Sequence, residues 1–293
     1  MNVMEFRTLL AAGPLLCDGA MGTQLQARGL KPGENGEVWC VERPEVVAAI
    51  HKAYVDAGAQ LITTNTFGAN RAILSRHGLE SRVREFNLAG ARVARQGAGS
   101  RTLVLGDVGP FGDFLEPIGA MTEPELEAIF AEQITALREG GADGIIIETM
   151  ADPAEAVVAA RVARKIADWP VIVTFSFSRL ADGTFRTFTG ATPAQIVSAL
   201  QAVGVDALGA NCGTSLSLTD YTGLAAAFVL AAGKTAVILQ PNAGSPQGTS
   251  WVPADPATMA GIVPGLLAAG VRIIGGCCGT TPAHIAALAA AMH

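Results

Sequence analysis

The sequence is poor in aromatic and charged residues, which make up 5% and 16% of its 293 positions. Acidic and basic side chains are mixed along the chain and leave a net charge of −6. Proteins that bind nucleic acid usually cluster Lys and Arg on one stripe or face, and the sequence has no such cluster. We therefore expect no nucleic-acid partner.

An uninterrupted apolar run long enough to cross a membrane is also missing. The best candidate, residues 224–239, is broken by a Gly-Lys pair, whereas a spanning helix needs about 20 apolar residues. The start of the chain carries Glu5 and Arg7 and lacks the layout of a secretory signal. We expect a cytoplasmic protein without a membrane partner, whose five cysteines stay reduced. Cys17 and Cys40 fit ordinary buried residues.

Cysteine pairs of the C-x-x-C type, which are typical of structural zinc sites, are absent. The chain instead carries two adjacent cysteines, Cys277 and Cys278, between Gly276 and Gly279 after an apolar run. Adjacent cysteines can be buried core residues, a strained redox disulfide or half of a structural zinc site. A further cysteine, Cys212, also follows an apolar run. Three thiols at strand ends match a catalytic zinc site, which leaves the fourth position open for substrate.

Short apolar runs, each followed by a helix-like segment, recur along the whole chain. They lack apolar–polar alternation, as expected for parallel strands that are buried on both faces. We predict the α/β class: a single (β/α)8 TIM barrel formed by residues 1–293 as one domain, with its active site at the C-terminal ends of the strands. The eight predicted strands are residues 15–17, 61–64, 103–105, 144–147, 171–175, 205–208, 236–239 and 271–274.

Polar residues follow these predicted strands and would meet at one mouth of the barrel. The sixth and eighth strands flank the seventh, which brings Cys212 close to the cysteine pair and favours the zinc interpretation. The residues concerned are Asp18, Thr64, Asp107, Glu148, Asn211, Cys212, Asn242, Cys277 and Cys278.

Local sequence leaves the roles of the acids open. Asp18 can cap the helix that follows it or bind the amine of a ligand whose carboxylate meets the next backbone N–H groups. Glu148 is either a caged structural acid or a ligand contact at the mouth. Asp107 fits a structural role in its Gly-Pro turn as well as a role in the site.

Several of these segments together resemble the zinc-dependent homocysteine S-methyltransferase family. The chain is most similar to the homocysteine-binding module of cobalamin-dependent methionine synthase, and it is also similar to betaine–homocysteine methyltransferase. The resemblance runs from about Leu15 to the C-terminus. It is carried by residues 18–23 (DGAMGT), 64–70 (TNTFGAN), 106–110 (GDVGP), 148–149 (ET), 211–212 (NC), 241–244 (PNAG) and 275–282 (GGCCGTTP).

The resemblance implies one Zn²⁺ per chain, held by Cys212, Cys277 and Cys278. It also implies homocysteine as substrate and methionine as product. Asn242 matches a position that can fill the fourth metal site before homocysteine arrives. Asp18 and Glu148 match residues that hold the amino group. The remaining substrate-binding residues implied are the backbone N–H groups near Gly19 and Ala20, for the carboxylate, and Thr64.

The methyl donor is left open by the sequence. The closest resemblance suggests a split methionine synthase that receives methyl from methylcobalamin on a separate corrinoid protein. The Asp-x-His-x-x-Gly pattern of cobalamin modules is absent. The alternative is direct transfer from betaine or a methylsulfonium, for which a quaternary ammonium favours an aromatic cage. Betaine enzymes carry Tyr where this chain has Gly68. Aromatic residues in loops near the predicted mouth are Trp39, Phe67, Phe111, Phe114, Phe177 and Trp251.

A non-catalytic protein is the alternative from another class. In that case the barrel would be a thiol-based redox sensor, whose adjacent cysteines, Cys277 and Cys278, form a disulfide. Bound zinc at one ion per chain argues against a sensor, and a metal-free protein with this disulfide would support it.

Overall fold

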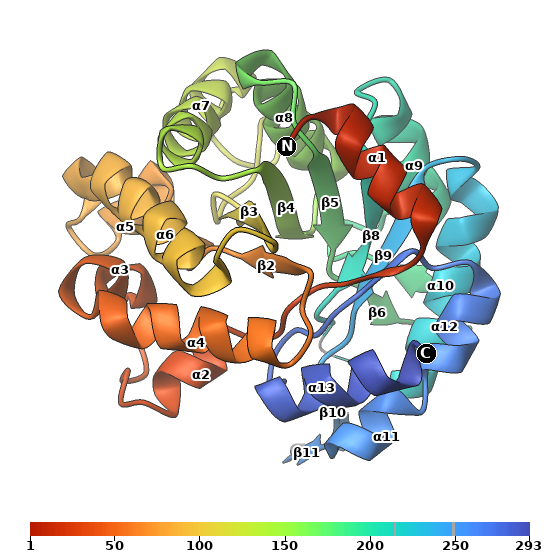
Figure 1. The fold of residues 1–293 in the computed structure, drawn as a ribbon. Helices are drawn as coiled ribbons and strands as arrows, with labels where there is room; N and C mark the ends of the chain where they lie inside the picture. The colour runs from red at the N-terminus through yellow and green to blue at the C-terminus, as the bar shows by residue number, and fades with distance from the viewer. Residues whose placement is uncertain (214, 248–249) are drawn as a thin grey trace.

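The computed structural model describes residues 1–213, 215–247 and 250–293, and eight parallel strands form its central sheet (Figure 1). A parallel bridge between Cys17 and Leu61 joins the first strand to the last. The sheet therefore closes almost completely, and the predicted (β/α)8 barrel is confirmed. The strands in spatial order are β1 (Leu15–Leu16), β12 (Ile273–Ile274), β9 (Ala236–Gln240), β8 (Ala207–Asn211), β5 (Val171–Phe175), β4 (Gly144–Met150), β3 (Leu103–Val108) and β2 (Leu61–Thr63).

Helices surround this sheet (Figure 1). Several begin with the same local signal: Asp152, Thr192 and Thr281 are N-caps, and each is followed by proline at the first helical position. In chain order the helices after β1 are α2 (Gly22–Gln26), the 3-10 helix η1 (Gly36–Val38), α3 (Trp39–Glu42), α4 (Pro44–Asp56), α5 (Arg71–Ser75), the 3-10 helix η2 (Glu80–Arg82), α6 (Val83–Ala98), α7 (Glu123–Glu139), α8 (Pro153–Ile166), α9 (Pro193–Gln201), α10 (Leu218–Ala232), α11 (Pro256–Ala260), α12 (Val263–Ala269) and α13 (Pro282–Ala291).

The barrel interior is a packed apolar layer to which every strand contributes. Helix α1 (Val3–Ala12), which the sequence did not predict, crosses the N-terminal end of the barrel and packs Phe6 and Leu10 against this layer. The interior side chains are Leu15, Cys17, Leu61, Leu105, Ile146, Ile172, Ala207, Ile238 and Ile273. The barrel interior is therefore a filled core that α1 covers at one end, and the active site of such a barrel lies at the other end.

Two short antiparallel hairpins follow strands of the barrel, and two predicted strands start later than expected. After β5, β6 (Ser178–Arg179) pairs with β7 (Phe185–Arg186). After β9, β10 (Gly244–Gln247) pairs with β11 (Ser250–Pro253). Such hairpins pair backbone groups that an irregular loop would leave to solvent. Strands β8 and β12 begin at Ala207 and Ile273, two positions after the predicted starts at Val205 and Val271.

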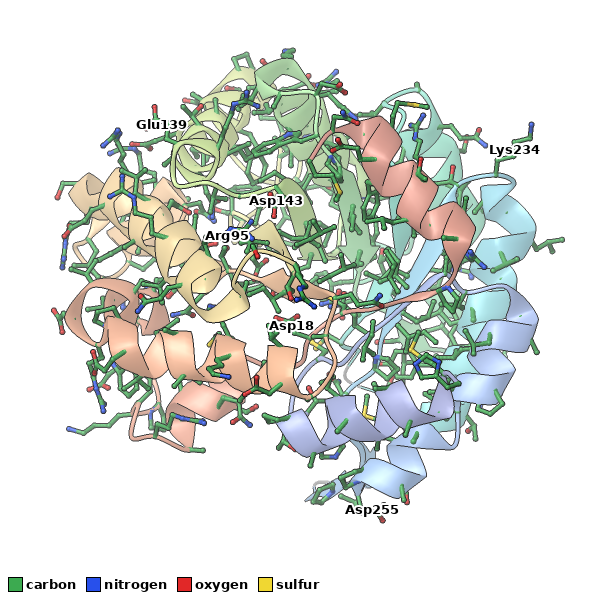
Figure 2. All side chains as sticks on the ribbon, viewed as in Figure 1. Asp18, Arg95, Glu139, Asp143, Lys234 and Asp255 are labelled. Atoms are coloured by element: carbon green, nitrogen blue, oxygen red, sulfur yellow. The ribbon has the colours of Figure 1, made fainter. Side chains whose placement is uncertain are left out.

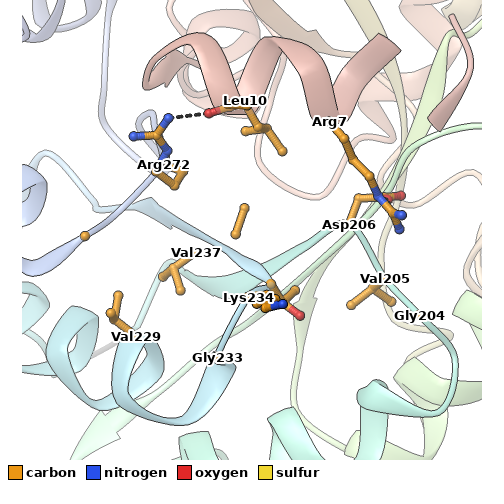
Figure 3. A pocket seen from close by; sticks show the side chains of 14 residues that line it. Arg7, Leu10, Gly204, Val205, Asp206, Val229, Gly233, Lys234, Val237 and Arg272 are labelled. Carbon is orange, nitrogen blue, oxygen red and sulfur yellow. Dashed lines mark hydrogen bonds and ion pairs between the residues drawn. The ribbon is translucent and has the colours of Figure 1, made fainter. Parts of the chain in front are cut away.

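A cavity of about 780 Å³ lies beside α1 at the N-terminal end of the barrel (Figure 3). Two arginines in its lining, Arg7 and Arg272, are paired there. Arg7 Nε donates to Asp206 Oδ1 at 2.9 Å, and Arg272 donates to the carbonyl of Leu10 at the end of α1. These contacts tie the terminal helix to the strands, a stabilising role that is typical of this end of a barrel.

Figure 2 shows Asp18 near the centre of the ring of helices, while Glu139, Lys234 and Asp255 lie at its periphery. Within the described residues, no helix combines the length and apolar character needed to cross a membrane.

Candidate metal and substrate site

At the C-terminal ends of the strands the barrel interior changes from apolar to polar. Side chains alternate along a strand, so Asp107 follows Leu105 on the inner face of β3 and Glu148 follows Ile146 on β4. A cavity of about 440 Å³ opens above this layer, within the range of about 300–1,000 Å³ that is common for small ligands. Both acids and all three predicted metal-binding cysteines line it.

Cys212, Cys277 and Cys278 come together on one side of the cavity. Their sulfur atoms all lie within 4.8 Å of one another. The Cys212 and Cys278 sulfurs are 3.9 Å apart, and the Cys277 and Cys278 sulfurs are 4.0 Å apart. A disulfide bond is about 2.05 Å long, so the adjacent pair is not bonded. Cys17 and Cys40 are free and buried elsewhere, as predicted.

The backbone around Cys212 is held in an uncommon conformation. Cys212 has φ of +54°, which non-glycine residues rarely adopt and which concentrates at functional sites. The Tyr221 hydroxyl donates to the Cys212 carbonyl. After the neighbouring strands β12 and β9, Cys277 N donates to the Pro241 carbonyl at 2.8 Å. These bonds fix the positions from which the sulfurs point toward one another.

Asn211, which precedes Cys212, supports the thiols from below. Its Oδ1 accepts from Thr149 N at 3.0 Å and from Thr174 Oγ1 at 2.9 Å. Its Nδ2 donates to Thr149 Oγ1 at 2.7 Å and lies 3.7 Å from the Cys277 sulfur. The amide therefore links β4, β5 and β8 to one thiol. Asn211 belongs to a motif noted in the sequence, but no role in supporting the metal-binding thiols was predicted for it.

The thiol cluster fits a zinc ion. Tetrahedral coordination with Zn–S bonds of about 2.3 Å places sulfurs about 3.8 Å apart, close to the two distances measured here. Asn242 Nδ2 donates to the Gly213 carbonyl at 3.1 Å, whereas its Oδ1 is buried without a partner in the part of the chain that the structure describes. An unpaired buried acceptor next to ligand-type sulfurs is the donor set expected of a metal site.

Acidic side chains form the opposite side of the cavity. Asp18 follows β1, Asp107 lies on β3, and Glu148 lies on β4, where the register against β5 shifts between Ile147 and Met150. Register shifts include β-bulges, which redirect side chains and are frequent next to active sites. Because β1, β2, β3 and β4 are consecutive around the nearly closed sheet, we call Asp18, Asp107 and Glu148 the acidic arc.

Burial holds the pKa values of this arc well above those of ordinary carboxyl groups. Asp18 Oδ2 accepts from Thr63 N at 2.8 Å, yet loss of solvent raises the Asp18 pKa to about 7. Loss of solvent, followed by the charges of Asp18 and Cys212, raises the pKa of Glu148 to about 8. A positive ligand would restore both groups to the ionised form.

The predicted carboxylate-binding segment differs in part from expectation. The backbone N–H of Ala20 already donates to Thr280 Oγ1 at 2.8 Å, so it is not free for a ligand. A β-carbon on Gly19 would lie 2.5 Å from the same Thr280 oxygen, so only glycine fits there. Thr64 Oγ1 accepts from Asp107 N at 2.9 Å and bonds to a neighbouring hydroxyl, although Thr64 also lines the cavity.

Thr23 is a further polar group that the sequence did not single out. It lines the cavity at the start of α2. Its Oγ1 is buried and has no partner within the described residues. No sequence signal marks it beyond its place in the 18–23 segment, because threonines at helix starts are common caps.

Gly68 leaves room for a buried acid rather than for an aromatic ring. Glu37 Oε1 accepts from Gly68 N at 2.6 Å, and a β-carbon at position 68 would lie 2.8 Å from that oxygen. Of the aromatic residues considered from sequence, Trp39, Phe111 and Phe177 are buried. Phe67 lines the cavity, Phe114 stacks on Phe188 with ring centroids 6.1 Å apart, and the side chain of Trp251 lies outside the described residues.

The fold and the cavity define a (β/α)8 barrel with a cluster of three thiols at its mouth, and known proteins are similar to this chain. A profile of the homocysteine S-methyltransferase family matches residues 15–292. The crystal structure of the homocysteine methyltransferase MmuM from Escherichia coli, in its metallated form, is 29% identical. It covers 97% of this chain and 98% of that chain with a TM-score of 0.79.

The chain belongs to the homocysteine S-methyltransferase family, whose members are methyltransferase enzymes. Methionine synthase from Mycobacterium tuberculosis is 33% identical over 97% of this chain and 25% of that protein. The relative from Mycobacterium leprae is 32% identical, over 97% of this chain and 24% of that protein. The chain thus spans about a quarter of the length of these methionine synthases.

Proposed function

We propose that residues 1–293 act as one unit that methylates the sulfur of homocysteine and forms methionine. One observation carries the proposal: a single cavity has metal-binding thiols on one side and the acidic arc on the other. Homocysteine has a thiol at one end and an ammonium at the other. Its two ends therefore match the two sides of the cavity.

Binding would place the ammonium against Asp18 and Glu148. The carboxylate would lie near Gly19, with the unpaired Thr23 hydroxyl and the backbone N–H groups at the start of α2 as its donors. In this orientation the substrate sulfur faces the cysteines, away from the carboxyl groups. The acids then position the substrate and stay out of the methyl transfer.

We propose that Cys212, Cys277 and Cys278 hold one Zn²⁺. A free thiol is mostly protonated at neutral pH. Zinc bound at this site would lower the pKa of a coordinating thiol, so that the substrate binds as a thiolate. Asn242 Oδ1 would fill the remaining position until substrate displaces it, and Asn211 would orient Cys277. The sulfur–methyl bond forms as the donor–methyl bond breaks. The substrate thiol gives its proton to solvent on binding, and the donor leaves with the electron pair of the broken bond, so the displacement itself requires no general acid.

A separate corrinoid protein carrying methylcobalamin is our first candidate for the donor. The rim of the mouth carries exposed apolar side chains on the loops after β2, β3 and β5, which suits contact with a second protein. These side chains are Phe67, Ile118, Leu180 and Phe188. The similarity to part of the methionine synthases supports the same donor. Free thiols suit a reducing cytoplasm for both proteins.

A self-sufficient reaction with a small cationic donor is the second candidate. It is supported by the similarity to MmuM over nearly the whole of both chains. The cavity also carries several acids, and no basic side chain lines it among the described residues. A methylsulfonium fits such a cavity better than betaine does, because Phe67 is the one aromatic residue found in the described lining and quaternary ammonium groups prefer aromatic cages.

A donor panel tests the proposal. Zinc-loaded protein with homocysteine receives methylcobalamin, betaine, S-methylmethionine or S-adenosylmethionine, and the methionine formed is counted. Turnover with methylcobalamin alone supports the corrinoid-dependent enzyme. Turnover with a sulfonium or betaine supports the self-sufficient one. A metal-free protein with a bond between Cys277 and Cys278 would instead support the redox-sensor alternative.

A further inference from the structure

Asp107 is the one member of the acidic arc to which the proposed reaction gives no task. It lies on the inner face of β3, between Asp18 after β1 and Glu148 on β4, and its side chain is 5% exposed. From sequence, a structural role in the turn after β3 was an equal alternative. The contacts of Asp107 in the structure distinguish this structural role from a role in the substrate site.

The backbone of Asp107, not its side chain, makes the structural contacts. Asp107 N donates to Thr64 Oγ1 at 2.9 Å, and the Asp107 carbonyl accepts from Thr66 Oγ1 at 2.7 Å. The side-chain Oδ1 is buried and has no hydrogen-bond partner in the described part of the chain. A carboxyl group that stabilised the turn would accept bonds from it, so the turn does not account for this side chain.

The groups that face Asp107 make an unpartnered acid costly. Burial first, and then the charges of Glu148, Asp18 and Glu37, raise its pKa well above the ordinary value. Within the described residues, no lysine, arginine or histidine lines the cavity to offset these acids. Natural proteins keep such a destabilising arrangement mainly where a ligand needs it.

We infer that Asp107 is a third contact for the substrate ammonium, beside Asp18 and Glu148, and that it makes the enzyme select thiols that carry an amino group. The inference rests on the proposed function. An ammonium has three N–H donors and no acceptor, so one acceptor from each acid satisfies it completely. A thiol without the amine would bury these carboxyl groups unpaired, and sites of this kind reject such analogues strongly.

Calorimetric titration of the zinc-loaded protein tests this without a methyl donor. Homocysteine is compared with 4-mercaptobutanoate, which lacks only the amino group, on wild type and Asp107→Asn. The substitution keeps the shape and removes the charge. We expect Asp107→Asn to weaken homocysteine binding about ten- to a hundredfold, as loss of a charge-assisted hydrogen bond does. Binding of 4-mercaptobutanoate should change by less than about threefold.

A matched control is Glu155→Gln, which neutralises a buried acid that accepts from Phe111 N and is absent from the cavity lining. It should leave both affinities unchanged. Titration in buffers of different ionisation enthalpy counts the protons released. Because ammonium binding ionises Asp107, Asp107→Asn should release fewer protons than wild type when homocysteine binds, a difference that a structural role would not produce.

Each outcome decides between the ideas. If Asp107→Asn keeps its full preference for homocysteine and its full proton release, the role of Asp107 is refuted while the proposed function stands. If wild type binds neither homocysteine nor 4-mercaptobutanoate, the role of Asp107 and the proposed function are both refuted. Asp107→Asn should unfold at no lower temperature than wild type, since it removes an unpaired buried acid, so failed folding cannot explain weaker binding.

Discussion

Replacing Asp18 by Asn should make the protein bind its substrate more weakly and yet make it more stable. Asn keeps an oxygen that can accept from Thr63 N, which is 2.8 Å from the carboxylate. It removes the charge that faces the substrate ammonium. Loss of one charge-assisted hydrogen bond is worth about 1.5–3 kcal/mol, so the KM for homocysteine should rise about ten- to a hundredfold.

The stability gain follows from the pKa of the buried acid. In the unfolded chain Asp18 ionises near 3.8, whereas in the folded protein burial raises its pKa to about 7. An acid with a raised folded pKa supports folding fully below pH 4, and this support is lost as the pH rises through 7. Relative to its value below pH 4, the free energy of unfolding is therefore lower by at most about 4 kcal/mol at pH 8 and by about 2 kcal/mol at pH 5.5, where only the unfolded chain is ionised.

Thermal unfolding of Asp18→Asn and wild type, at equal zinc loading and without homocysteine, measures this difference. The variant should unfold at a higher temperature at pH 8, with a smaller gain at pH 5.5. Steady-state kinetics supplies the KM. A variant that is less stable than wild type at pH 8, or that keeps the wild-type KM, would refute the assignment of Asp18 as a destabilising acid kept for the substrate amine.

Three further substitutions follow from the site and its supports. Cys277→Ala should lose zinc and methyl transfer together, whereas Cys40→Ala, a buried thiol outside the cavity, should keep both; metal analysis and activity check this. Gly209→Ala should prevent folding, because its β-carbon would lie 1.9 Å from the Ile238 carbonyl oxygen, and circular dichroism should show little structure. Asn211→Ala should weaken zinc affinity about 10–100-fold, measured by chelator competition, and unchanged affinity would contradict its link to the thiols.

Much of the barrel was predictable because its signals are local. Each strand is a short apolar run, and caps such as Thr281 with Pro282 mark where helices begin. The barrel topology alone then predicts that the polar residues at the strand ends meet at one mouth. Cys212 and the pair at 277–278 are distant in sequence, but β8 and β12 both pair with β9, which brings their ends to one side.

The remaining features depend on contacts that no local pattern encodes. Helix α1 was missed, although Phe6 and Leu10 close the N-terminal end of the barrel. The bond from Ala20 N to Thr280 joins residues 260 positions apart, so its removal of a free N–H was invisible in the sequence. Asp107 could be placed at the mouth, but only the packed structure shows that its Oδ1 has no partner among the residues described.

The central claim is that the sulfur of homocysteine joins Cys212, Cys277 and Cys278 at one zinc ion. X-ray absorption at the zinc edge, on protein with one zinc per chain, measures this directly. The account predicts three sulfur neighbours at about 2.3 Å in the free protein and four after homocysteine is added. A sulfur count that does not rise with homocysteine would contradict it.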